Sequence, residues 1–118
     1  METRSNPPVR IESVAGSRPG VVILKVQGPL EITNYGEFEE LMRRNEARVL
    51  LVDLSEVPYI DSAVLGSMVA THVACARNQR KYALVRANQR IQNMLTVSGV
   101  GEIIMSFATV AQAETSLA

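Results

Sequence analysis

The first residues that could do chemistry are Asp61 and Ser62, at the point where a turn leads into an amphipathic segment. The free backbone N–H groups of a helix start favour an acidic cap and would also bind a phosphate. A side-chain cap contributes about 1 kcal/mol to stability. Helix capping therefore explains Asp61 about as well as a binding role does, and the sequence leaves both interpretations open.

The second candidate group is His72 with Cys75, the only histidine and the only cysteine of the chain. Two such residues form a minimal metal-binding pair, but a zinc site needs further ligands, and none is evident. We expect His72 to be a core or boundary residue with satisfied hydrogen bonds, and Cys75 to be a buried thiol. We expect no metal and no cofactor.

Neither a catalytic group nor a nucleotide loop stands out. A nucleophile with a base and an orienting residue is not evident. The glycines at 99 and 101 fit a helix end better than a phosphate-binding loop. We therefore expect a protein that is not an enzyme.

The composition sets the scale of the fold. The chain has 118 residues, of which 47% are hydrophobic, so one domain with a real core is the natural expectation. We expect a disordered segment at 1–8 and a single domain at 9–118. No apolar run reaches the roughly 18 residues that span a bilayer, and no leader is apparent, which favours a cytoplasmic protein without membrane insertion.

The charge is balanced overall but uneven along the chain. Residues 30–61 contain eight acidic and three basic residues, whereas residues 62–101 contain five basic residues and no acid. Such polarity can steer a partner of opposite charge, although a solvated rim explains it as well. Nucleic-acid binding is not expected, because the isoelectric point is near 6.6 and Tyr82 is the only aromatic residue among the basic ones of residues 62–101.

Hydrophobic patterns predict the elements that must position these residues. Two β-branched runs, at 9–14 and 21–27, flank a Ser-Arg-Pro-Gly turn and predict a hairpin. A helix is expected over 33–45, with Asn34 and Glu37 as a capping pair. The aliphatic run at 49–52 is typical of a strand buried on both faces.

The second half alternates in the same way. Helices are expected over 62–78, from Asn88 to residue 97 with Gly99 at its end, and from Thr109 and Gln112 to about residue 117. Strands are expected at 81–86 and 103–107. The alternation predicts an α/β fold with a mixed, mainly parallel β-sheet and about four helices packed on it.

The start of the helix at 62–78 carries apolar residues on more than one face. We expect Ala63, Val64 and the following leucine to form an exposed apolar turn, rimmed by Asp61, Ser62 and Ser67, of the kind that marks a protein interface. Val64→Asp should then disrupt docking with little loss of stability. Self-association through this turn into a homodimer is a further possibility.

Several motifs fall in order along the chain. They are Gly28-Pro29-Leu30-Glu31, Val52-Asp53-Leu54-Ser55, Tyr59-Ile60-Asp61-Ser62, Leu65-Gly66 and Gly99-Val100-Gly101. With these motifs the chain resembles the STAS domain of anti-sigma factor antagonists over roughly residues 9 to 117. The resemblance implies a STAS-like sheet with helices, in agreement with the pattern of the elements.

The resemblance also implies a function, partner switching. Such a domain binds an anti-sigma factor that is a serine kinase, and phosphorylation turns the domain off. The family motif is Asp-Ser-Ser/Thr-Gly, whose second hydroxyl residue accepts the phosphate. Here the acceptor position is Ala63 and the glycine is Val64. Without that hydroxyl the usual switch is absent, and Ser62 is a possible but less favoured substitute acceptor.

The hypothesis is a regulatory protein that docks onto an anti-sigma factor or serine kinase-like partner. Its alternatives are a STAS module that scaffolds a larger signalling assembly, a subunit attached to the ATPase of a membrane transporter, or a module that binds a small molecule or nucleotide. Other STAS proteins are a further candidate class of partner. The residues expected to bind the partner are Glu31, Thr33, Asp61, Ser62, Ala63, Val64, Gly66 and Ser67.

Overall fold

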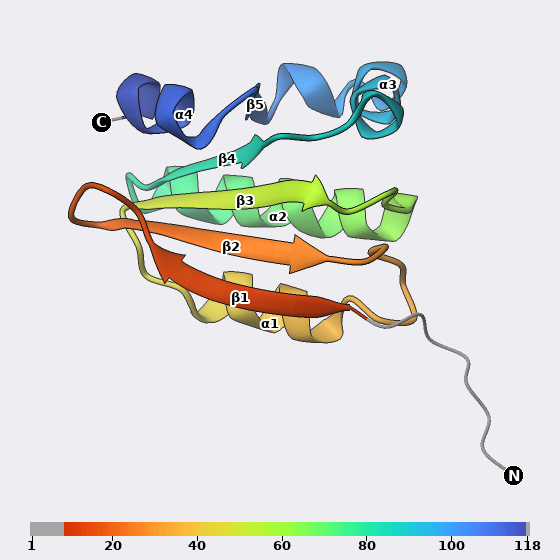
Figure 1. Ribbon diagram of the computed structural model, residues 1–118, viewed down its shortest axis with the longest axis horizontal. Helices are drawn as coiled ribbons and strands as arrows, with labels where there is room; N and C mark the ends of the chain where they lie inside the picture. Colours follow the sequence, from red (N-terminus) through yellow and green to blue (C-terminus); the bar gives the residue numbers. More distant parts are fainter. Residues whose placement is uncertain (1–8, 118) are drawn as a thin grey trace, which may run out of the picture.

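The computed structural model describes residues 9–117, so the disorder expected at 1–8 lies outside the described residues. Helices and strands alternate after an initial pair of strands (Figure 1). The strands are β1 (Arg10–Ala15), β2 (Val21–Gln27), β3 (Val49–Glu56), β4 (Lys81–Val85) and β5 (Met105–Phe107). The helices are α1 (Gly36–Arg44), α2 (Ser62–Arg77), α3 (Gln89–Ser98), the short 3₁₀ helix η1 (Val100–Glu102) and α4 (Val110–Leu117).

The five strands form one sheet in the order β1-β2-β3-β4-β5. The hairpin partners β1 and β2 are antiparallel, and all other neighbours are parallel. The predicted mixed, mainly parallel sheet is therefore confirmed. Because β2, β3 and β4 run the same way, their carboxyl ends and the loops that follow them meet at one edge of the sheet.

Two hydrophobic layers, one on each face of the sheet, hold the helices against it. Alternate side chains of β2, β3 and β4, such as Leu24, Leu50 and Leu84, pack on one face with residues of α1, α2 and α3. The intervening side chains, such as Ile23 and Leu51, pack on the other face against α4. One face is thus covered by three helices and the other by one.

The beginning of α1 differs from the expectation. The helix starts at Gly36, its N-cap position is Tyr35, and no side chain caps it. The predicted capping pair of Asn34 and Glu37 is wrong because the Asn34 amide group serves the preceding loop. Its Oδ1 accepts from the backbone N–H of Glu31 at 2.9 Å, and its Nδ2 donates to the Pro29 carbonyl at 2.9 Å.

The other boundaries shift by smaller amounts. The buried strand extends beyond the aliphatic run to Glu56, since the chain stays paired with β2 as far as Gln27. The last strand is shorter than expected, because the N–H groups of Ile103 and Ile104 donate to the Val100 carbonyl of η1 instead of pairing in the sheet. No helix within residues 9–117 combines the length and apolarity that a bilayer crossing requires.

The predicted helix ends of the second half are confirmed. Asn88 Oδ1 accepts from the Ile91 N–H at 2.8 Å, and Gly99 ends α3 in the left-handed region at φ 82°. Thr109 Oγ1 accepts from the Gln112 N–H at 3.0 Å at the start of α4. These local signals set where α3 begins and ends and where α4 begins.

Candidate functional site

The loops that follow β2 and β3 are joined to each other. Leu30 and Ile60 form an isolated parallel bridge. The Leu30 N–H donates to the Tyr59 carbonyl at 3.2 Å, and the Asp61 N–H donates to the Leu30 carbonyl at 3.1 Å. Both Leu30 and Ile60 are buried. The two loops therefore form a single unit beside the start of α2.

Asp61 connects this unit to the helix. Its Oδ1 accepts from the Val64 N–H at 3.2 Å, which confirms Asp61 as the N-cap of α2. Its Oδ2 accepts from the Ile32 N–H at 2.8 Å, a contact that sequence reasoning missed. One carboxylate thus holds two segments that are 29 residues apart in sequence.

A second polar contact supports the same loops. The Tyr59 hydroxyl donates to Glu31 Oε2, and this hydrogen bond raises the pKa of Tyr59 above its ordinary value of 10.0. The Arg90 guanidinium of α3 lies 4.8 Å from the centre of the Tyr59 ring, a cation–π distance. The sequence showed an aromatic residue before Ile-Asp-Ser, but not that α3 would reach it.

The structure brings most of the expected partner-binding residues together. Thr33, Ser62 and Gly66 are exposed, and Glu31, Asp61 and Ala63 are half-buried. Ile32, which was not among the expected partner-binding residues, is 64% exposed in the loop that follows β2. We call these seven residues the loop-helix surface: Glu31, Ile32, Thr33, Asp61, Ser62, Ala63 and Gly66.

The expectation of an exposed apolar turn is wrong. Val64 is completely buried and Leu65 is 5% exposed, because both side chains join the core between α2 and the sheet. Ser67 is also buried, and its hydroxyl donates to Glu39 Oε2 of α1 at 3.2 Å. The side chains of Val64 and Ser67 therefore hold α2 in place and are not available to a partner.

The structure also shows the surroundings of Ala63, the residue that the sequence resemblance predicts at the phosphate-acceptor position. Ala63 lies in the first turn of α2, half-buried, between the exposed Ser62 and the buried Val64. A phosphate there would lie at the positive end of the helix but next to the Asp61 carboxylate. The Ser62 side chain is exposed, so a kinase could reach it.

The second candidate group, His72 and Cys75, agrees with the expectation from the sequence only in part. Cys75 is buried as expected, and burial raises its pKa above 9.0. His72 is half-buried on α2, but its Nδ1 lacks a hydrogen-bond partner among residues 9–117, so the expectation of satisfied hydrogen bonds is wrong. Within the same residues, no three or more His, Cys, Asp or Glu side chains are grouped as a metal site.

Comparisons with known sequences identify the family. The STAS domain model matches residues 13–113. An anti-sigma-B factor antagonist of Staphylococcus aureus is 30% identical over 84 residues, which cover 69% of this chain and 78% of that protein.

Solved structures show the same fold. An anti-sigma factor antagonist from Thermotoga maritima superposes with a TM-score of 0.83 at 22% identity, covering 91% of this chain and 93% of the other. One from Mycobacterium paratuberculosis gives 0.79 at 18% identity, covering 92% and 94%. The overall fold is therefore a known one. Because the STAS domain model matches most of the chain, the chain belongs to the STAS domain family.

Proposed function

We propose that this protein is an anti-sigma factor antagonist that acts by docking its loop-helix surface onto an anti-sigma factor of the serine-kinase type. The observation that carries the proposal is the double role of Asp61, which holds the Ile32 loop against the first turn of α2. This contact presents an exposed apolar side chain next to small and polar residues without requiring either loop to be ordered upon binding. Preorganisation of this kind lowers the entropic cost of association.

The chemistry of the surface fits a protein partner. Ile32 supplies the apolar centre, and Glu31 and Asp61 supply negative charge at its rim. Gly66 leaves open space one turn further along α2, since no atom lies within 4 Å of the position that a Cβ would take, apart from its chain neighbours and the backbone of the helix itself. A partner with a basic rim around an apolar contact would complement this surface.

The proposal includes an unswitched mode of action. Ala63 stands at the family's acceptor position and has no hydroxyl to receive phosphate. The doubly negative group that would eject the partner is then not formed at this position. The antagonist would remain competent to bind for as long as it is present, so its amount in the cytoplasm would set its activity.

A binding assay with the anti-sigma factor kinases of the native host tests the docking. Ile32→Asp should weaken binding at least tenfold, because it places a charge at the apolar centre. Val97→Asp is the matched control, because Val97 is 89% exposed on α3 and lies outside the loop-helix surface. Equal binding by both variants, or binding only to other STAS proteins or to a transporter ATPase, would reject the proposal.

Phosphorylation is tested with the same kinase and ATP. The wild type should stay unmodified, whereas Ala63→Ser should be phosphorylated and should then lose its affinity for the kinase. Mass spectrometry of the modified peptide distinguishes residue 63 from Ser62. Stoichiometric modification of Ser62 in the wild type would show that the protein is switched after all, by the neighbouring hydroxyl.

A further inference from the structure

The face of the sheet that carries α4 is only half covered. Helix α4 packs over the amino-terminal halves of the parallel strands, where Ile23, Leu51 and Ala83 form the core. Toward the carboxyl ends of the strands, the same face bears charged and polar side chains instead. Parallel strands are usually buried on both faces, so this uncovered half is unusual for the central strands of a sheet.

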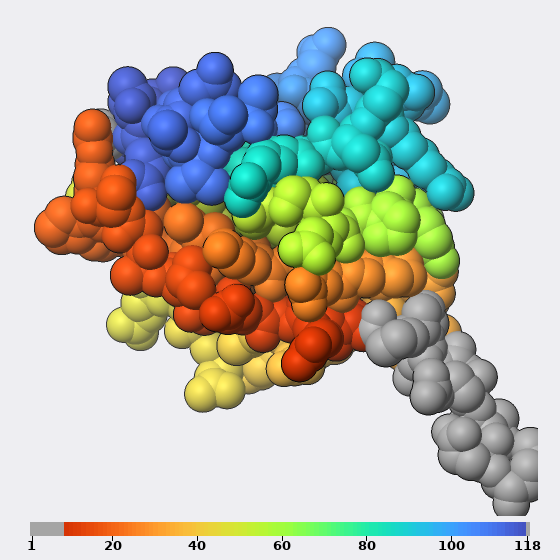
Figure 2. All heavy atoms as spheres, in the orientation of Figure 1, coloured from red at the N-terminus to blue at the C-terminus, as the bar shows by residue number. Residues whose placement is uncertain are grey.

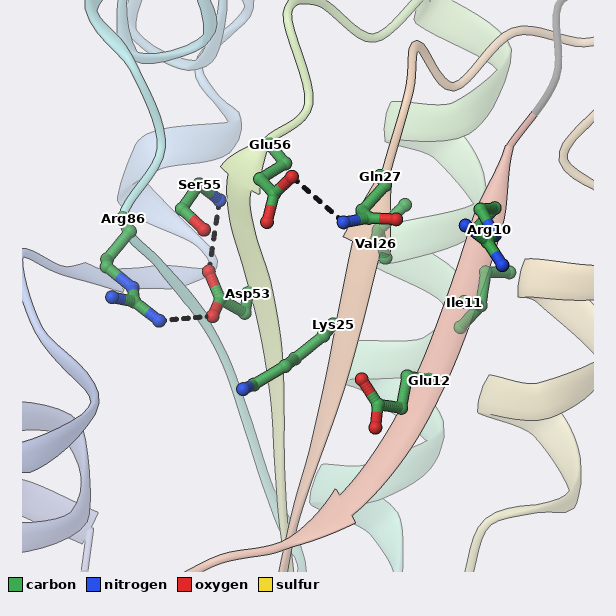
Figure 3. Close-up of a pocket in the computed structure, with 10 residues that line it drawn as sticks. All are labelled: Arg10, Ile11, Glu12, Lys25, Val26, Gln27, Asp53, Ser55, Glu56 and Arg86. Carbon is green, nitrogen blue, oxygen red and sulfur yellow. Dashed lines mark hydrogen bonds and ion pairs between the residues drawn. The ribbon is translucent and has the colours of Figure 1, made fainter.

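These side chains enclose a hollow of about 480 Å³ (Figure 3). This volume lies within the range of small-molecule sites, and the hollow lies at the carboxyl ends of parallel strands, where open α/β sheets bind ligands. Figure 2 shows this face of the sheet, with α4 (blue) over one part of it. The lining residues with polar side chains are Arg10, Glu12, Lys25, Gln27, Asp53, Ser55, Glu56 and Arg86.

One side of the hollow is built around a buried carboxylate. Asp53 of the central strand is 2% exposed, accepts from Arg86 at 2.5 Å and accepts from the Ser55 N–H at 3.0 Å. Arg86 adopts a left-handed backbone conformation, with φ 59°, and its side chain remains 46% exposed. A strained non-glycine residue at a polar hollow is a common sign of function. Within residues 9–117, the Arg86 guanidinium donates no side-chain hydrogen bond other than the one to Asp53, so its remaining N–H groups can bind a ligand.

The charges nearby are poorly paired. Lys25 lies next to Asp53 and Glu12 in the register of the neighbouring strands. Even so, among residues 9–117 neither Lys25, Glu12 nor Arg10 has an ion-pair partner within 4.0 Å. The Lys25 side chain extends toward Asp53 and Arg86 (Figure 3). Glu12 lies on β1, on the opposite side of Lys25.

We propose that this hollow binds a small zwitterion of the amino-acid type. The free N–H groups of Arg86 and the Lys25 ammonium would hold the carboxylate of the ligand, and Glu12 would hold its ammonium group. Three basic and three acidic residues line the hollow, so a ligand with both charges matches it better than a simple anion. The hollow and the loop-helix surface lie on opposite faces of the sheet, so this proposal does not depend on partner docking.

Titration of the isotopically labelled protein, followed by NMR of its backbone amides, tests the proposal. Each of the twenty amino acids is added separately, together with analogues that lack either the amine or the carboxylate. At least one amino acid should shift the amide signals of Lys25, Ser55 and Arg86 in a saturable way, with Kd below about 1 mM. Both analogues of that amino acid should bind at least tenfold more weakly.

The variant Lys25→Met keeps the aliphatic stem but removes the charge, and should weaken binding at least tenfold. Lys81→Met is the matched control, since Lys81 is an exposed lysine at the opposite end of the sheet, and its affinity should be unchanged. The proposal is overturned if no amino acid shifts these signals, or if Lys25→Met binds like the wild type. It is also overturned if the analogue that lacks the amine binds as tightly as the amino acid itself. The Ile32→Asp variant should titrate like the wild type.

Discussion

The Ile32 backbone N–H donates to Asp61 Oδ2 at 2.8 Å, and this hydrogen bond couples the loop after β2 to the start of α2. The other oxygen of the same carboxylate caps the helix. A cap alone needs only one acceptor, and Ser or Asn would serve. The bond to Ile32 explains why a carboxylate suits position 61, since its second oxygen makes a contact that helix capping does not require.

Asp61→Ala should lower the free energy of unfolding by about 1 to 2 kcal/mol, because a helix cap and a hydrogen bond to a charged group are both lost. It should also weaken partner binding, since the Ile32 loop loses its tether. Urea denaturation measures the first effect and the kinase binding assay measures the second. Ser62→Ala is the control for stability and should stay within about 0.5 kcal/mol of the wild type. A loss of binding without any loss of stability would contradict the structural role given to Asp61.

Val64→Asp should unfold or severely destabilise the protein, by several kcal/mol, because a carboxylate would be buried without a partner. This reverses the expectation from the sequence that the substitution would affect docking alone. Ala63→Asp, one residue earlier and half-buried, is the matched control and should retain the fold. Thermal denaturation decides between them, and a melting temperature of Val64→Asp close to that of the wild type would contradict the burial of Val64.

The error at Val64 shows where sequence reasoning stops. The apolar run of β3 and the caps at Asp61, Asn88 and Thr109 are local signals, and the structure confirms them. Which face of a helix is buried depends on what packs against it. Helix α2 is apolar over a wide arc, so its pattern could not reveal that Val64 faces the core.

The contacts within the loops were harder to predict from the sequence than the helices and strands. The Asn34 side chain looked like a helix cap, but it bonds to the Glu31 N–H, because the loop after β2 has backbone groups that need partners. The contacts of Tyr59 with Glu31 and Arg90 join segments that are far apart in sequence. Neither relationship leaves a periodic signal, so only the fold could show them.

Two glycines should respond in opposite ways to substitution by alanine. Gly66→Ala should raise the free energy of unfolding by about 1 kcal/mol, because Gly66 lies within α2 with open space around its Cα. Gly16→Ala should lower it, because the added Cβ would lie 2.5 Å from Val21 Cγ1 and 2.6 Å from Glu114 Oε2. Urea denaturation of both variants checks the signs.

The two variants should also differ in binding. The methyl group of Gly66→Ala lies on the loop-helix surface, so the more stable protein should bind the kinase more weakly. Gly16 lies outside that surface, at the turn between β1 and β2. Its variant should bind normally at temperatures at which it is folded. Unchanged binding by Gly66→Ala would remove Gly66 from the contact region.

Asp53 should make the protein sensitive to acid. Burial alone would raise the pKa of Asp53, but hydrogen bonds from Arg86 and Ser55 outweigh it, and the net pKa is below the ordinary value of 3.8. The folded state therefore binds this proton more weakly than the unfolded state does. The stabilisation is complete above about pH 5 and is lost as the pH falls through 3.8 toward the lower, folded-state pKa.

Hydrogen bonds from Ser17 also lower the pKa of Glu114, so Glu114 adds a similar acid sensitivity. Comparison of the wild type with Asp53→Asn isolates the effect of Asp53. At neutral pH the variant should be less stable than the wild type by about 1.5 to 3 kcal/mol, the range for a hydrogen bond to a charged group. The difference should shrink as the pH falls from 5 to 3. Glu37→Gln, at an exposed position of α1, controls for the removal of one carboxylate. A stability difference that stays constant over this range would mean that Asp53 is not ionised against Arg86, and the ion pair would have to be abandoned.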